Sequence, residues 1–248
     1  MAVFRNVTAT ILLHRCRSPR RWRHTIDKNR VHPLKEGNRS YVGLIIVVNS
    51  LLLYAVAQES TISVAGLKAL LTESTNLLPV GFALIVTTVA NGLLSAETKA
   101  RLVFLKWNYA LPGHRAFSKY AATDPRVDIS NLKKICGNKF PDDPVEQNRT
   151  WYRLYKTVEG DASVLQVQRD FLLMRDYVGL AALFVVVFGS VALVEVSSWR
   201  VSLTYCLFLV AQFVLVRQAA STYGVRFVTT VLAEKAATPA RGSAKNAS

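Results

Sequence analysis

The sequence predicts an all-α integral membrane protein. We expect four transmembrane helices in two hairpins, with a helical cytoplasmic stalk and cap between the second and third spans. Two observations carry this prediction. The 248 residues, 51% of them hydrophobic, include four long stretches without a single Asp, Glu, Lys or Arg. The basic residues gather in alternate segments between those stretches, as in membrane proteins of fixed orientation.

The four uncharged stretches match the length that a helix needs to cross a bilayer. A helix rises about 1.5 Å per residue and the hydrocarbon core is about 30 Å thick, so about 20 apolar residues suffice. The last stretch is short, and we extend it to about Arg200–Tyr223 because a terminal Arg can place its head in the interface. One such run also fits a buried helix of a soluble protein, but four would need a larger core than this chain can enclose. The stretches are Tyr41–Gln58, Ser74–Ala96, Tyr177–Val194 and Val201–Val216.

The distribution of Lys and Arg predicts the topology. Ten lie in residues 1–40, fourteen in 95–176 and five in 217–248, whereas the two short connections hold only Lys68 and Arg200. Cytoplasmic segments retain basic residues close to the membrane. We therefore expect both termini and the central segment to be cytoplasmic.

The N-terminal segment is expected to bind anionic lipid headgroups of the bilayer, at about 1 kcal/mol per basic residue near the surface. Residues 1–26, with six Arg and no acid, also fit an organellar presequence, which would place the protein in the mitochondrial inner membrane. Nucleic acid suits the net charge of +15 less well, because no base-reading motif accompanies it. The candidate headgroup contacts are Arg20, Arg21, Arg23 and Arg39.

The second and third spans are expected to continue into the cytoplasm as helices. The residues after Leu94 are good helix formers, and Val164, Val167, Phe171 and Met174 repeat at helical spacing before the third span. These extensions would pack as an antiparallel stalk that carries a compact cap. The predicted segments are a basic N-terminal arm (1–40), a first transmembrane hairpin (41–96), the cytoplasmic stalk and cap (97–176), a second hairpin (177–225) and a basic disordered tail (226–248).

The chain contains no enzymatic motif: it has no Gly-rich phosphate loop, no His-Glu-x-x-His and no nucleophile elbow. The densest polar cluster is residues 141–156, where Asp143 can cap the helix that Pro144 starts and Glu146 completes a capping box. A divalent-cation site built from Asp142, Asp143 and Glu146 is the alternative. We expect no catalytic residue, no metal and no cofactor.

Three aromatic residues of the cap lie within about one helical turn, and their simplest role is the cap's own small core. The alternative is a surface that senses or docks a cytoplasmic protein or a small ligand. The candidate residues of that surface are Arg115, Asp143, Asn148, Arg149, Trp151, Tyr152 and Tyr155.

The predicted spans contain amides and hydroxyls but no central charge. Side-chain amides in lipid tend to pair between helices, at about 0.6 kcal/mol on average. Helix packing therefore explains these residues most simply, and they would line a narrow polar path only if several subunits assemble. The candidate path residues are Asn49, Asn91, Thr87 and Gln212.

Three runs of the cap, Leu111–Ser118, Asp124–Asp128 and Asp143–Lys156, resemble uncharacterised four-span inner-membrane proteins of bacteria, of the anti-phage effector type. The likeness covers about residues 95–180. It implies a bacterial inner membrane and a hairpin–cap–hairpin layout, in which a sensed signal leads to membrane disruption. The resemblance supplies no catalytic residue and does not include the basic arm.

These observations favour a non-enzymatic, oligomeric membrane effector or channel-like protein, gated through its cap by a cytoplasmic protein or a small ligand. The main alternative is a membrane-anchored scaffold that conducts nothing. A membrane enzyme built on residues 141–156 is the third hypothesis.

Overall fold

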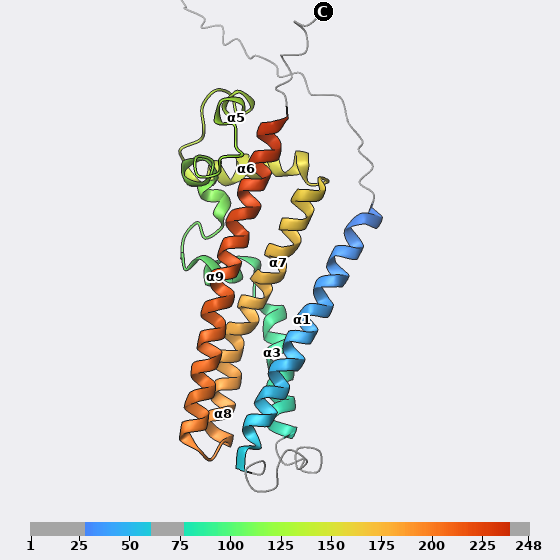
Figure 1. Ribbon diagram of the computed structural model, residues 1–248, viewed down its shortest axis with the longest axis vertical. Coiled ribbons are helices and arrows are strands. Elements are labelled where there is room, and N and C mark those ends of the chain that lie inside the picture. Colours follow the sequence, from blue (N-terminus) through green and yellow to red (C-terminus); the bar gives the residue numbers. More distant parts are fainter. Residues whose placement is uncertain (1–27, 61–76, 239–248) are drawn as a thin grey trace, which may run out of the picture.

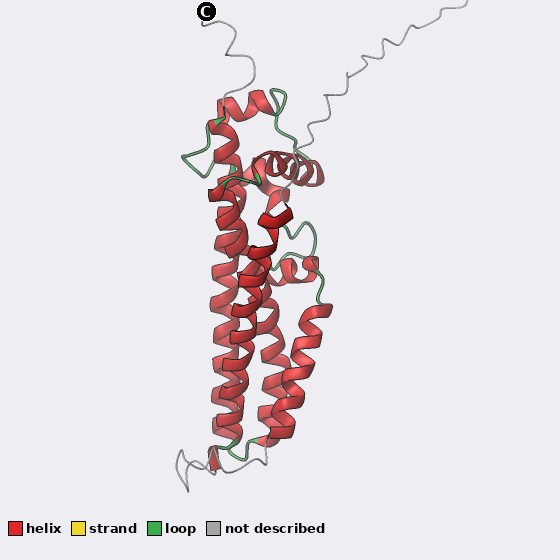
Figure 2. Ribbon diagram, turned by 90° about the vertical axis from the view of Figure 1, so that its right-hand side faces the viewer, coloured by secondary structure: helices red, strands yellow, loops and turns green. Residues whose placement is uncertain are grey.

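In the computed structural model, which describes residues 28–60 and 77–238, every regular element of the described chain is a helix (Figures 1 and 2). Several of these are short helical turns, labelled η. The elements are α1 (Lys28–Ala57), α3 (Leu77–Leu93), α4 (Ala96–Phe104), η2 (Pro112–Arg115), η3 (Ala116–Tyr120), α5 (Ile129–Ile135), α6 (Pro144–Val158), α7 (Ala162–Leu183), η4 (Phe184–Phe188), α8 (Gly189–Glu195) and α9 (Trp199–Ala237).

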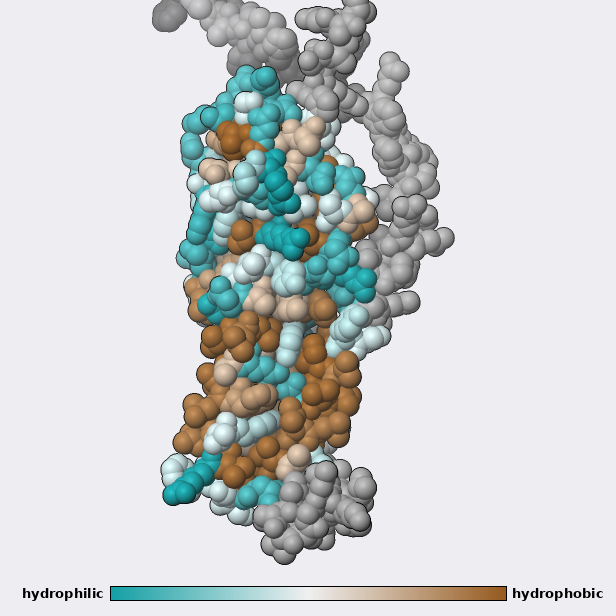
Figure 3. Space-filling view, viewed as in Figure 1, coloured by the Kyte–Doolittle hydropathy of each residue, from teal (hydrophilic) through white to brown (hydrophobic). Residues whose placement is uncertain are grey.

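The helices form an elongated bundle with two chemically different halves. The α7–η4–α8 rod and α9 run side by side along the whole length, while α1 and α3 flank them at one end (Figure 1). That end, the apolar half, is largely hydrophobic on its surface, whereas the cap (residues 111–160) forms a largely hydrophilic other end (Figure 3). The first turns of α1 and the last turns of α9 both lie toward the cap end (Figure 1).

Three helical segments are long and apolar enough to cross a membrane: Ser40–Ala57, Ala162–Glu195 and Trp199–Ala237. A fourth candidate combines Leu78–Leu93 with Ala96–Phe104, two helices that meet at 99°. In the apolar window of α9 only 17% of the residues are buried by this chain. So large an apolar surface needs cover that the chain itself does not supply, and a bilayer would supply it.

The predicted stalk is wrong in one of its two helices. We expected the second span to continue past Leu94, but α3 ends at Leu93 and α4 starts anew at a sharp angle. Ser95 causes this break because its Oγ accepts the backbone N–H of Thr98 at 3.1 Å, as an N-cap does. The chain ends α4 at Leu105, in the left-handed region with φ 48°. The long partner of α7 is therefore α9, not an extension of α3.

Both predicted terminal boundaries also need correction. Residues 226–237 are the last turns of α9 rather than a disordered tail, because Phe227, Val228, Val231 and Leu232 are buried at helical spacing against the cap. At the other end, α1 begins at Lys28, inside the segment assigned to the basic arm. Residues 1–27 and 239–248 lie outside the described chain.

The cap is built on α7 and α9 as one hydrophobic core. The Trp151 ring meets Phe227 of α9 edge-on at 5.3 Å between centroids and stacks on Tyr155 at 5.8 Å. Gly224 of α9 leaves room for aromatic rings from α4 and α7: a Cβ atom there would lie 2.6 Å from Phe104 and 2.8 Å from Phe171. The core therefore joins the cap to both long helices.

The predicted helix start at Asp143 is confirmed. Its carboxylate accepts the backbone N–H of Glu146 at 3.0 Å, and Pro144 occupies the first helical position. Asp161 occupies the N-cap position of α7, although its side chain makes no capping bond. Of the apolar series expected on α7, Val164, Val167 and Phe171 are buried.

Candidate functional site

The four polar residues predicted to line a path each leave one buried side-chain atom without a partner. Asn49 is 3% exposed; its Nδ2 donates to the carbonyl oxygen of Ile45 at 2.9 Å, but its Oδ1 accepts no hydrogen bond. Thr87 is fully buried, and its Oγ1 has no partner. The same holds for Asn91 Oδ1 and Gln212 Oε1. Each unpaired buried atom of this kind costs about 1–3 kcal/mol.

Two of these residues approach α7 from different helices. Asn91 comes from α3 and lies close to Gly179, where a Cβ atom would be 3.3 Å from its Oδ1. Gln212 comes from α9 and donates through Nε2 to the Tyr177 hydroxyl at 2.8 Å. No hydrogen bond joins any two of the four candidate path residues, all of which lie in the described chain. In one copy, their polar atoms therefore do not form a connected path.

A charged contact that the sequence did not predict lies between α4 and α7. The Lys99 ammonium is 3.2 Å from a carboxylate oxygen of Asp176, and the Lys99 side chain is only 10% exposed. The same oxygen accepts a hydrogen bond from the Arg175 guanidinium at 3.2 Å. The Lys99 stem also packs beside Gly179, close to Asn91. The structure thus places a half-enclosed charge cluster next to one of the candidate path residues.

The seven residues predicted for a sensing or docking surface have different environments. Trp151 and Tyr155 belong to the buried cap core, whereas Tyr152 is 51% exposed. The Arg115 guanidinium donates to the carbonyl oxygens of Tyr109 and Ala110, both at 3.4 Å.

The other three of these residues lie in the first turns of α6. Asn148 packs against Gly113, and Asp143 caps the helix. Exposed Arg149 pairs with Glu146 at 2.5 Å. Of the seven, Asp143, Arg149 and Tyr152 are exposed, and Arg149 and Tyr152 lie one helical turn apart on α6.

The carboxylates proposed as a cation site are occupied by contacts within the chain. Asp142 pairs with Lys139 at 2.9 Å, Asp143 caps α6, and Glu146 pairs with Arg149. Within residues 28–60 and 77–238, no group of three or more His, Cys, Asp or Glu is placed to hold a metal ion. These contacts account for the polar cluster as local structure.

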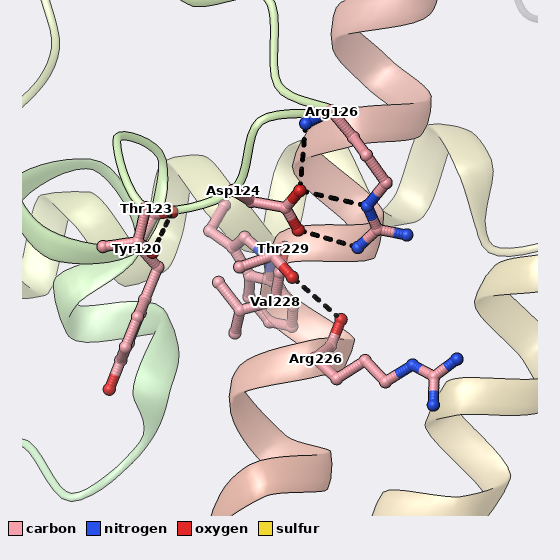
Figure 4. A network of polar contacts seen from close by, with 8 residues as sticks. Tyr120, Thr123, Asp124, Arg126, Arg226, Val228 and Thr229 are labelled. Atoms are coloured by element: carbon pink, nitrogen blue, oxygen red, sulfur yellow. Dashed lines mark hydrogen bonds and ion pairs between the residues drawn. The ribbon is translucent and has the colours of Figure 1, made fainter.

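The loop before α5 lies against α9 and is organised by Asp124 (Figure 4). Its carboxylate accepts three hydrogen bonds from Arg126: from the backbone N–H at 3.0 Å, from Nε at 3.0 Å and from Nη2 at 2.7 Å. These bonds hold the pKa of Asp124 well below its ordinary value, although burial opposes the shift. Thr229 of α9 lies beside this pair (Figure 4).

The last turn of α9 is also held by its neighbours. Asn131 of α5 donates through Nδ2 to the carbonyl oxygens of Ala236 at 2.6 Å and Thr238 at 3.0 Å, groups that the helix itself leaves unpaired. Ser163 of α7 donates to the Glu234 carboxylate at 2.6 Å. The end of α9 is thereby fixed to both the cap and α7.

Acidification is expected to weaken the cap through Asp124 only below about pH 4. A carboxyl whose folded pKa is depressed stabilises the fold above its unfolded pKa of about 3.9, and this stabilisation is lost as the pH falls through the lower folded value. Thermal unfolding of wild type and Asp124→Asn, followed by near-UV circular dichroism, should differ by a constant amount from pH 7 to about 4.5 and converge below it. Asp142→Asn, at an exposed carboxylate, is the matched control; convergence already between pH 7 and 5 would contradict the expectation.

The candidate headgroup contacts are mostly beyond what the structure describes. Arg20, Arg21 and Arg23 lie outside the described residues, and Arg39 lies within α1. The described cap and the partly unpaired polar residues of the apolar half are therefore the candidate functional regions. Comparison of the chain with protein-family models, with curated proteins and with solved structures finds no match.

Proposed function

We propose that this protein is a non-enzymatic membrane effector of the channel-like type, which acts as an oligomer and is gated through its cap. The observation that carries the proposal is the set of buried, unpaired atoms on Asn49, Thr87, Asn91 and Gln212 in the apolar half. Within one copy the chain's own helices enclose these atoms, and lipid offers no hydrogen bonds, so only a change in helix packing that admits water would pair them. An oligomer in which α1, α3 and α9 move to enclose a water-filled path would provide this change.

The proposed membrane arrangement has four crossings, by α1, α3, the α7–η4–α8 rod and α9. Three of these are long, apolar helices, and the fourth is the bent pair of α3 and α4. This arrangement puts both termini and the cap on one side, in agreement with the Lys and Arg that gather in those segments. We assign that side to the cytoplasm of a bacterium, and the resemblance of residues 95–180 supports a role in anti-phage defence.

The cap is the proposed sensor because it packs on α9, the helix that carries Gln212. Phe227 of the cap core and Gln212 lie on the same uninterrupted helix, 15 residues apart. At about 1.5 Å per residue, a displacement of the cap reaches the polar residues over about 22 Å of rigid helix. A ligand or protein that binds the cap would thereby change how α7 and α9 pack in the membrane.

The test is ion leakage through the bacterial membrane after induced expression, measured with a potential-sensitive dye. Replacing Asn49, Asn91 and Gln212 together with leucine is expected to reduce the leak at least tenfold while membrane insertion is retained, because the polar atoms of the path are removed. Leucine matches the bulk of these side chains and inserts favourably.

The matched control is a triple leucine variant at exposed hydroxyls whose hydrogen bonds stay within their own helices, Thr88, Ser190 and Thr222. It should leak as wild type does. Equal leakage from the Asn49/Asn91/Gln212 variant and wild type would remove these residues from any path. An intact potential in wild type, with and without neighbouring gene products, would instead favour a membrane-anchored scaffold, with Arg149 and Tyr152 on its docking face.

A further inference from the structure

A groove lies between α1 and α9, near the start of α9 and at the end of the bundle opposite the cap. Its volume is about 460 Å³, within the range of small-molecule sites, and its walls are almost entirely apolar. In the described chain, α1 and α9 each pack mainly on α7 and touch each other only weakly, which leaves the groove open along its side. The lining residues are Leu52, Val56, Arg200, Val201, Thr204, Tyr205 and Phe208.

Two of the lining residues supply polar groups that the described chain does not pair. Tyr205 is 5% exposed, and its buried hydroxyl has no hydrogen-bond partner. Arg200 stands at the start of α9, and no carboxylate of the described residues forms an ion pair with it. Arg200 and Tyr205 are five residues apart on α9, about 7.5 Å along its axis, and both line the groove. The groove therefore combines apolar walls with one cationic and one hydroxyl-bearing side chain.

We infer that this groove binds one glycerophospholipid, in an inference that rests on the membrane insertion proposed above. One acyl chain would lie along Leu52, Val56 and Phe208. The negative phosphate would meet Arg200 at the interface. The Tyr205 hydroxyl, enclosed by the chain when the groove is empty, would turn into the groove and donate to an ester carbonyl oxygen between phosphate and chain. This order of cation, hydroxyl donor and apolar wall matches the order of groups in a phospholipid. A buried hydroxyl without a partner destabilises the fold, and the ester oxygen would supply the missing partner.

The occupant is a phospholipid rather than a second copy of the chain because of charge complementarity. A second copy that paired groove to groove about a two-fold axis would bring its own Arg200 beside the first, and like charges repel. A phosphate diester instead carries a negative charge that can pair with the Arg200 guanidinium. The bound lipid would fill the space between α1 and α9 and stabilise the folded bundle in proportion to its concentration.

Native mass spectrometry of the full chain in neutral detergent, with added dioleoyl phosphatidylglycerol, tests this inference. Wild type should retain one such lipid per chain and bind dioleoylglycerol, which has the same chains but no phosphate, at least tenfold more weakly. Arg200→Gln should weaken phosphatidylglycerol binding about tenfold or more, and Tyr205→Phe about threefold to tenfold. Arg226→Gln removes a charge from an exposed position elsewhere on α9 and should leave binding unchanged.

Equal binding by wild type, Arg200→Gln and Tyr205→Phe would overturn the assignment, as would equal binding of dioleoylglycerol. A lipid-free dimer that dissociates in Phe208→Ala would place a second copy in the groove and would also overturn it. Carbonate extraction of bacterial membranes tests insertion separately. A wild-type chain that resists extraction but fails the lipid test contradicts the lipid site alone, whereas a chain that is extracted contradicts the proposed function.

Discussion

Replacing Trp151 with alanine is expected to separate α6 from α9 and to cost the cap about 3–5 kcal/mol of stability. The Trp151 ring is 8% exposed, meets Phe227 edge-on and stacks on Tyr155. Its Nε1 donates to the carbonyl oxygen of Val228 at 3.4 Å. Truncation would remove the largest ring of this contact and leave a cavity that its neighbours cannot fill without moving α6 or α9.

Hydrogen exchange of the α6 amides measures this loss directly. About 3 kcal/mol corresponds to exchange more than a hundredfold faster, while amides of α1 and α3, far from the cap, should keep their wild-type rates. Tyr152→Ala, one position along α6 and half-exposed, is the matched control. It should change the free energy of opening obtained from the exchange rates by less than about 1 kcal/mol. Similar acceleration in both variants would show that Trp151 does not join the cap to α9.

The Trp151→Ala variant also tests whether the cap controls the leak through α9. If it does, the variant should no longer leak in response to the ligand or protein that binds the cap, even though Asn49, Asn91 and Gln212 are intact. A normal response with a loosened cap would mean that the signal reaches the membrane by another route. The stability measurement and the leakage measurement therefore answer different questions about one residue.

Local sequence patterns predicted which helices form better than they predicted where those helices end. The uncharged stretches coincide with the second part of α1, with all of α3 and with the apolar parts of α7–α8 and α9, because apolar length is a property of the sequence itself. The break after Leu94 was missed because Ser95 has two compatible roles, inside a helix or as the N-cap of a new one. The sharp turn places α4 beside α7, and only tertiary packing decides between those roles.

The end of α9 was missed for a related reason. Residues 226–237 begin at Arg226 and include Glu234 and Lys235, so they were grouped with the polar residues that follow them, although seven of the twelve are apolar. Their helix is stabilised by Val228 and Val231, which are buried against the cap, and by Asn131, which pairs the last carbonyl groups. Those contacts join residues about a hundred positions apart, and no local pattern contains them.

The polar residues of the proposed site were selected from the sequence alone. The polar residues of the spans could be found because an amide in an apolar run is conspicuous, and the structure adds that each has an unpaired atom. The contact of Lys99 with Asp176 was missed because Lys99 was counted only among the basic residues that assign topology, and Asp176 was given no role. A usable signal was present: Lys99 follows the second uncharged stretch by three positions and Asp176 directly precedes the third, so both charges belong at the same level of the bundle.

Replacing Asp176 with asparagine is expected to destabilise the bundle by about 1–3 kcal/mol. Removal of one partner from a fully buried ion pair costs about 3–5 kcal/mol, and the 33% exposure of Asp176 lowers this through solvent screening. The loss falls on Lys99, which is 10% exposed and has no second carboxylate within the described chain. Lys99→Met should cost less, about 1 kcal/mol or under, because Asp176 keeps its bond to Arg175 and the enclosed charge itself is gone.

The relative stability of Asp176→Asn and Lys99→Met tests which partner of the ion pair depends on the other. Thermal unfolding in detergent should give Asp176→Asn the lower midpoint, and the double variant should lie above Asp176→Asn, because no enclosed cation is then left unpaired. Glu97→Gln, which breaks an exposed pair with Arg101 on the same helix α4, is the control and should shift the midpoint little. If Lys99→Met is the more damaging change, the carboxylate rather than the ammonium depends on the pair. The role of the cluster beside Asn91 would then be to hold a negative charge at the end of the apolar half.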